Sequence, residues 1–119
     1  NFGADLLKDL GAARNGVHGD PSGALRLFEQ AREIRVRLGS LETAAGAQLL
    51  WNAGIARAAA ADTEGSLADF AEARAIFDRT GSLRTESGAM FLNGMGLACS
   101  DRGDLRGALE AFEEARGIR

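Results

Sequence analysis

The chain repeats itself every 42 residues, and this period constrains its fold more than any other feature of the sequence. The stretches GDPSGALRLFEQAREIR, residues 19–35, and GDLRGALEAFEEARGIR, residues 103–119, agree at eleven of seventeen positions. A looser copy, ADTEGSLADFAEARAIF, occupies residues 61–77, midway between them. A fixed period of about 20 to 50 residues is typical of solenoids, in which each unit buries its apolar face against its neighbours.

The segments between these copies repeat as well. GSLETAAGAQLLWNAGIA, residues 39–56, matches GSLRTESGAMFLNGMGLA, residues 81–98, at its glycines and at several apolar positions. Each unit therefore has two segments, and we expect each segment to form one helix. The predicted units are 1–38, 39–80 and 81–119, within a single repeat domain over residues 1–119 that we expect to be a fragment of a longer array.

The first kind of segment carries the signals of a helix that begins at an aspartate. Asp20, Asp62 and Asp104 are each placed to cap a first turn, and Pro21 stands where a missing N–H costs nothing. Apolar residues follow at spacings of three and four, which predicts one buried stripe comprising Ala24, Leu25, Phe28, Ala31, Ile34 and Leu38 in the first copy. The predicted helices span 21–38, 63–80 and 105–118.

The second kind of segment is richer in small residues. Its helices are expected to run from about Thr43 to Ala60 and from about Thr85 to Asp101, with a degenerate copy over residues 4–15 that leads into a loop one residue longer than its equivalents. Each glycine inside a helix costs about 1 kcal/mol relative to alanine, so we expect these backbones to pack closely against a neighbouring helix. The whole chain is then six helices in antiparallel pairs.

The spacing of small and aromatic residues resembles the tetratricopeptide repeat superfamily. The matching series are Gly54, Ala61, Ser66, Phe70 and Ala73, and then Gly96, Gly103, Ala108, Phe112 and Ala115. The usual unit of that family has about 34 residues, and the period of 42 is similar to the longer variety of kinesin light chain arrays. The resemblance implies an all-α fold, a right-handed superhelical solenoid of antiparallel helix pairs, that scaffolds other proteins without catalysis.

The resemblance also implies a concave face, lined by the first helix of each pair, on which a partner peptide or protein binds. The candidate binding residues are Lys8, Gln48, Trp51, Asn52, Ile55, Met90, Asn93 and Leu97. Some members of the family clamp a partner's terminal carboxylate on this face, but only Lys8 and Asn52 match the five clamp positions here. For Trp51 two roles stay open, because an aromatic side chain can anchor a peptide or simply fill space opposite small residues.

The residue content gives little support to an enzyme. The chain has one His, one Cys and no Tyr, so we expect no catalytic, cofactor-binding or metal-binding residue, and no cofactor. His18 is expected in a solvated turn, and Cys99 is expected to be buried as a small apolar residue. The basic stretch REIRVR, residues 32–37, is expected to form a solvated helix face.

The charge balance argues against nucleic acid and membrane partners. Fourteen basic residues are scattered among seventeen acidic ones, for a formal net charge of −3. No apolar run approaches the roughly 18 residues of a membrane helix. We therefore expect a soluble, cytoplasmic protein with protein or peptide partners.

A second function stays open beside the binding scaffold. The last predicted helix carries Leu109, Phe112 and Ile118, with no further unit in this sequence to cover them. Solenoids normally close with a polar capping helix. The alternative is a structural array that self-associates by stacking its uncapped ends head to tail.

Overall fold

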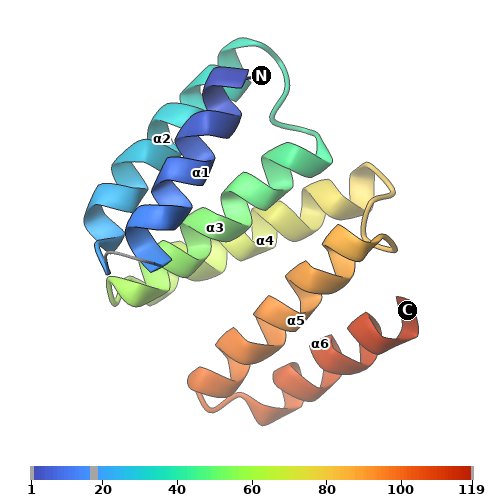
Figure 1. Cartoon of the computed structure of the whole chain (residues 1–119). Helices are drawn as coiled ribbons and strands as arrows, with labels where there is room; N and C mark the ends of the chain where they lie inside the picture. Colours follow the sequence, from blue (N-terminus) through green and yellow to red (C-terminus); the bar gives the residue numbers. More distant parts are fainter. Residues whose placement is uncertain (1, 17–18, 119) are drawn as a thin grey trace. The chain divides into compact units, whose positions relative to one another are not determined.

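The computed structural model describes residues 2–16 and 19–118, and in these ranges it contains six α-helices and no strands (Figure 1). The helices are α1 (Phe2–Gly16), α2 (Pro21–Arg37), α3 (Ala44–Ala59), α4 (Thr63–Arg79), α5 (Glu86–Asp101) and α6 (Leu105–Ile118). Contacts join α1 to α2, α2 to α3, and α5 to α6. The all-α prediction is confirmed, and each predicted helix end lies within two residues of the observed one.

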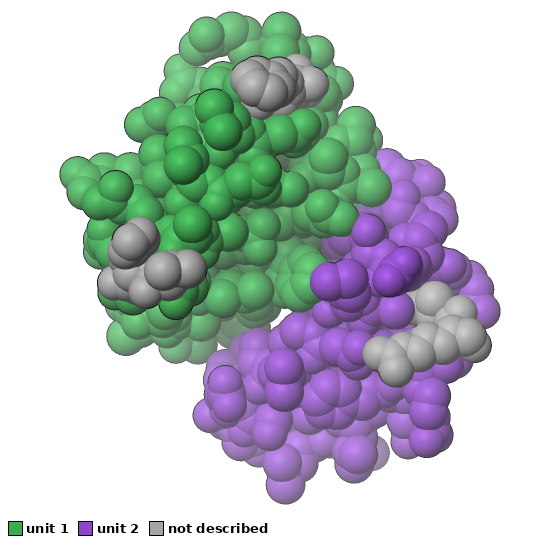
Figure 2. Space-filling view, in the orientation of Figure 1, with its two compact units in different colours: residues 1–76 green, residues 77–119 purple. Residues whose placement is uncertain are grey.

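The chain divides into two compact units, coloured separately in Figure 2. The first unit, Asn1–Ile76, holds α1, α2, α3 and most of α4. The second unit, Phe77–Arg119, holds the end of α4 together with α5 and α6. A single repeat domain with superhelical stacking stays a prediction.

Side chains at equivalent positions start the helices, as the sequence predicts. Asp20, Asp62 and Asp104 each accept a hydrogen bond, 3.0 Å long, from the backbone N–H of a glycine three residues later. Thr43 and Thr85 do the same for α3 and α5, at 3.1 and 3.2 Å. Each of these bonds satisfies one of the backbone donors that a helix start leaves without a partner in the helix. The period of 42 residues therefore reappears in the capping geometry.

The turns repeat their backbone conformation with the same period. Gly19, Ala61 and Gly103, which precede the capping aspartates, have φ angles of 60°, 65° and 81°. Gly39 and Gly81, which follow the ends of α2 and α4, have φ angles of 70° and 69°. Glycine adopts this left-handed region without a steric cost. Ala61 alone among the non-glycine residues of the described ranges adopts it.

The core of the first unit is built mainly from small residues of α1, α2 and α3. Its buried members are Ala4, Ala24, Phe28, Ala31, Leu49, Ala53 and Ala56, with Leu7, Leu25 and Ile34 partly buried against them. The predicted stripe of α2 is confirmed except at its end, since Leu38 is 63% exposed. Leu38 is the C-cap of α2, where the chain turns away from the helix axis toward Gly39, so its side chain leaves the stripe.

In the second unit, Phe77 and Phe91 are fully buried and their ring centroids lie 5.0 Å apart, tilted by 37°. Tilted aromatic pairs at this separation add to the stability gained from burial. Cys99 of α5 is also buried, as the sequence predicts. Its sulfur accepts a 3.6 Å contact from the Arg102 guanidinium. Cys99 therefore packs as a small apolar side chain within this unit.

Two of the helix glycines have the predicted role of close packing. A Cβ added to Gly54 would lie 2.7 Å from the Phe70 ring, and one added to Gly96 would lie 2.6 Å from the Phe112 ring. Gly11 of the degenerate first copy meets Phe28 at 2.6 Å in the same way. The three glycine–phenylalanine contacts each join the first and second helix of a pair.

The same prediction is wrong for Gly46 and Gly88. A Cβ at either residue would collide with the carbonyl oxygen of Leu41 or Leu83, in the turn just before its own helix. These glycines therefore make room for the turn that leads into α3 or α5, rather than for a neighbouring helix.

Candidate interaction surface

Four of the predicted binding residues lie on one face of α3 in the first unit. Gln48, Trp51, Asn52 and Ile55 follow the pattern i, i+3, i+4, i+7, so their side chains share one side of the helix. The remaining sides of α3 carry its buried residues. Gln48, Trp51 and Asn52 are half-buried, and Ile55 is 39% exposed. The result is an aliphatic side chain beside two amides and an indole.

Three further predicted residues lie on the equivalent face of α5 in the second unit. Met90, Asn93 and Leu97 stand one period after residues of the α3 face. Asn93 is half-buried, Met90 is exposed and Leu97 is 61% exposed. This face is more apolar and more open than the one on α3.

Lys8, the remaining predicted residue, lies on α1, which contacts α3 within the first unit. Its Nζ is 3.9 Å from the Asp9 carboxylate, and only 20% of its side chain is exposed. An apolar stem packed against the protein with an ammonium group near water is common for lysine. The structure therefore brings Lys8 and the α3 face into one unit, while the α5 face belongs to the other.

Trp51 is half-buried, and its indole nitrogen is buried. A partner on this face would therefore meet the exposed part of the ring rather than the N–H donor. Both roles considered for Trp51, peptide anchor and packing residue, are compatible with this position.

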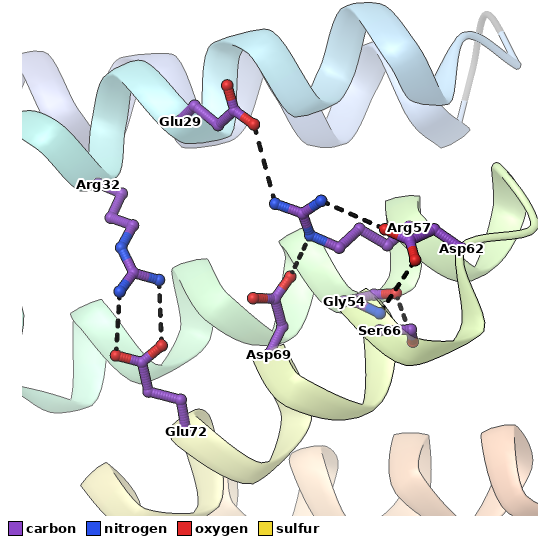
Figure 3. Close-up of polar contacts among 9 residues, drawn as sticks. Glu29, Arg32, Gly54, Arg57, Asp62, Ser66, Asp69 and Glu72 are labelled. Atoms are coloured by element: carbon purple, nitrogen blue, oxygen red, sulfur yellow. Dashed lines mark hydrogen bonds and ion pairs between the residues drawn. The ribbon is translucent and has the colours of Figure 1, made fainter.

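The sequence did not reveal a polar network centred on Arg57, at the end of α3 (Figure 3). Its Nε donates a 2.7 Å hydrogen bond to Asp69 of α4, and its guanidinium lies 3.5 Å from Asp62 and 3.8 Å from Glu29 of α2. Ser66 of α4 adds a 2.8 Å hydrogen bond to a carbonyl oxygen of α3. The network fixes α2, α3 and α4 against one another.

Arg32 of α2 makes a further inter-helix bridge. Its two terminal nitrogens donate to the two carboxylate oxygens of Glu72 on α4, at 3.0 and 3.2 Å (Figure 3). The sequence predicts a solvated face at Arg32, whose side chain is 42% exposed, but it does not predict this bond to another helix. Two parallel hydrogen bonds give such an arginine–carboxylate pair a defined orientation.

The prediction of a solvated face over residues 32–37 is wrong at Arg35, which is 4% exposed. Its guanidinium donates to Asp5 of α1 at 2.6 Å and to the Ser40 carbonyl at 3.2 Å. A buried arginine is tolerated because these acceptors satisfy it. By contrast, Arg37 and Glu33 pair at 2.8 Å on the exposed side of α2, as predicted.

Two carboxyl groups have shifted pKa values. Burial raises the pKa of Asp69 above its ordinary value of 3.8, outweighing the opposite effect of the bond from Arg57. The pKa of Asp20 is lowered, first by the backbone N–H of Gly23 and then by Arg14. The pKa shift of Asp20 therefore follows from its capping bond, whereas the pKa shift of Asp69 follows from burial, which the bond from Arg57 only partly offsets.

Two hollows, one in each unit, have linings made of apolar and charged residues together with one glycine. A cavity of about 20 Å³ in the first unit, room for about one water molecule, is lined by Leu25, Phe28, Glu29, Arg32, Leu49, Leu50, Ala53, Arg57 and Asp69. An open groove of about 330 Å³ in the second unit is lined by Phe77, Asp78, Gly81, Leu83, Arg84 and Glu114. Neither lining contains a Ser, Thr, Cys or His.

Within residues 2–16 and 19–118, no group of three or more His, Cys, Asp or Glu side chains is placed to hold a metal ion. His18, expected in a solvated turn, lies outside the described residues. None of the helices in the described ranges combines the length and the apolar character needed to cross a membrane. Comparison with protein-family models, with curated proteins and with solved structures gave no match to this chain.

Proposed function

We propose that the protein is a non-catalytic interaction scaffold that binds a peptide or protein segment on the faces of α3 and α5. The observation that carries this proposal is the repeated exposure of aliphatic side chains, at Ile55 in one unit and at Leu97 one period later in the other. A single exposed aliphatic residue is ordinary on a protein surface. Exposure at the same place in two units, beside Met90, favours a surface kept for a partner.

The chemistry of these faces supports a partner with apolar side chains and an accessible backbone. Aliphatic residues can bury the partner's apolar groups. The half-buried amides of Gln48, Asn52 and Asn93 each have both a hydrogen-bond donor and an acceptor for peptide groups. No acidic or basic residue belongs to the α3 or α5 set, so these faces favour neither polyanions nor polycations.

In this proposal the helix pairs stack as in tetratricopeptide arrays, with α1, α3 and α5 lining the concave side of a right-handed superhelix. The recurrence of three features with the 42-residue period supports it: the capping aspartates, the left-handed turn residues, and the glycine–phenylalanine contacts. In a tetratricopeptide-like array, both the sequence and the backbone conformation recur from one unit to the next. The three features recur in this way.

The test is selection of binding peptides from a phage-displayed library, followed by titration of one selected peptide into the protein. Trp51, the only Trp, reports binding by its fluorescence. We expect Ile55→Asp and Leu97→Asp each to weaken binding at least about tenfold, which corresponds to roughly 1.4 kcal/mol. The matched control is Val36→Asp, an exposed aliphatic residue of α2 outside both faces.

Equal affinity of all three variants would contradict the proposal, as would a library that yields no binder.

A self-assembling structural array is the alternative function. It is favoured by a different observation, the exposed leucines on α1 and α6.

A further inference from the structure

Within the first unit, Leu25, Glu29 and Arg32 of α2 lie where this helix meets the next helix pair. Leu25 packs against the core cluster, Glu29 lies 3.8 Å from Arg57 of α3, and Arg32 binds Glu72 of α4 at 3.0 Å. One apolar and two oppositely charged side chains, spaced by four and three residues, therefore form the surface on which the following pair docks.

The last helix, α6, repeats this docking surface. Leu109, Glu113 and Arg116 stand two periods after Leu25, Glu29 and Arg32. All three α6 residues are exposed, and Leu109 is 62% exposed. Phe112 is half-buried, whereas its equivalent in α2, Phe28, is 2% exposed. The α6 surface therefore has the residues of a docking face and lacks the cover that α2 has.

The first helix, α1, carries the complementary surface. In α3 the residues that face α2 include Leu49, Ala53 and Arg57, spaced by four. The loop before Asp20 is one residue longer than its equivalent before Asp62, so equivalent residues of α1 and α3 are 43 apart in the sequence. The equivalents in α1 are therefore Leu6, Leu10 and Arg14. Leu6 and Leu10 are each 49% exposed, and Arg14 is exposed as well.

We propose that the docking face of α6 binds the α1 stripe of a second copy of this chain. Leu6 and Leu10 of the second copy then cover Leu109. Arg14 of the second copy then faces Glu113, as Arg57 faces Glu29 within the first unit. The two surfaces are different and lie on different helices, so the contact is heterologous and copies add head to tail.

Sedimentation velocity tests this proposal on the 119-residue chain with two blocking variants. Leu109→Glu blocks the α6 face, and the double variant Leu6→Glu, Leu10→Glu blocks the α1 stripe. All three positions are exposed, so circular dichroism should show unchanged helix content. Val36→Glu, at another exposed aliphatic residue, is the matched control.

We expect the sedimentation coefficient of the unmodified chain and of Val36→Glu to rise with concentration. Each blocked variant alone should stay monomeric. An equimolar mixture of the two should form a two-chain complex that grows no further, because one intact α6 face remains for one intact α1 stripe. A monomeric unmodified chain at every concentration would overturn the proposal, and so would a blocked-variant mixture that stays monomeric while the unmodified chain associates.

The charge pair gives an independent readout. Glu113→Arg should weaken association of the chain, and mixing it with Arg14→Glu should restore a contact between opposite charges. Equal association of both variants and the unmodified chain would contradict the assigned pairing.

Discussion

Gly54 of α3 and Phe70 of α4 lie so close that a methyl group on the glycine would stand 2.7 Å from the phenylalanine Cε1. The same relationship joins Gly11 to Phe28, and Gly96 to Phe112. A helix interior normally disfavours glycine, by about 1 kcal/mol relative to alanine. The close approach of the ring explains why the chain accepts that cost at equivalent positions.

Gly54→Ala should therefore lower the free energy of unfolding by about 1–3 kcal/mol, because Phe70 is buried and its ring has little room to move. Gly3→Ala is the control, since nothing lies within 4 Å of a Cβ added there and the change should be neutral or stabilising by up to about 1 kcal/mol. Urea unfolding measures both. Equal stabilisation by the two substitutions would contradict the packing role of Gly54.

Ala61→Gly should raise stability. Ala61 has a φ of 65°, in the region where its equivalents Gly19 and Gly103 are glycines. The left-handed conformation destabilises an L-residue by about 1–2 kcal/mol, and substitution by glycine removes this strain. Part of the resulting gain in stability is lost, because glycine has more conformational freedom in the unfolded chain. We expect a net gain of about 0.5–1 kcal/mol in urea unfolding.

The control for that substitution is Ala58→Gly, on an exposed part of α3 with helical geometry. It should cost about 1 kcal/mol. If both substitutions destabilise the protein to the same degree, the left-handed conformation of Ala61 is wrong.

A double-mutant cycle should separate the Arg57–Asp69 bond from an ordinary surface pair. Asp69 is buried and its bond to Arg57 is 2.7 Å long, so Arg57→Ala and Asp69→Ala should couple by about 1–3 kcal/mol. The reference cycle uses Glu33 and Arg37, whose side chains are 70% and 71% exposed, and should give less than about 0.5 kcal/mol. Equal coupling energies in the two cycles would contradict the role of Arg57 in joining α3 to α4.

The two shifted carboxyl groups should affect stability with opposite signs. The lowered pKa of Asp20 means that its carboxylate stabilises the fold above pH 3.8, and this contribution is lost as the pH falls through the folded-state pKa. The raised pKa of Asp69 means that the folded state holds that proton more tightly than the unfolded state, so its contribution declines as the pH rises above 3.8. Titration of the carboxyl carbons by NMR should give Asp69 a higher pKa than Asp20. The reverse order would contradict both assignments.

The helices and their ends were predictable because the signals are local. Asp20, Asp62 and Asp104 cap a backbone group three residues away, and the turns depend on one or two residues such as Gly39. Because the chain contains three copies of nearly the same segment, one period of 42 residues apart, a weak indication of a helix end in one copy was supported by the same residues in the other two.

The inter-helix ion pairs were not predictable in the same way. Arg32, Arg35 and Glu29 have the composition of a solvated helix face, and only the packing of α2 on its neighbours decides that their partners are Glu72, Asp5 and Arg57. For the candidate surface, the resemblance implied the grouping of Gln48, Trp51, Asn52 and Ile55, and their places in α3 put them on one side of that helix. The degree of burial of Trp51 depends on tertiary packing, so its role could not be decided from spacing.

The most direct test of the binding function is an NMR titration of the labelled protein with a peptide selected from the phage-displayed library. We expect backbone shift changes to be largest on α3 around Ile55 and on α5 between Met90 and Leu97, and to be absent from the exposed side of α2 around Val36. Shift changes that are absent from both α3 and α5, or that centre on α2, would contradict the binding function.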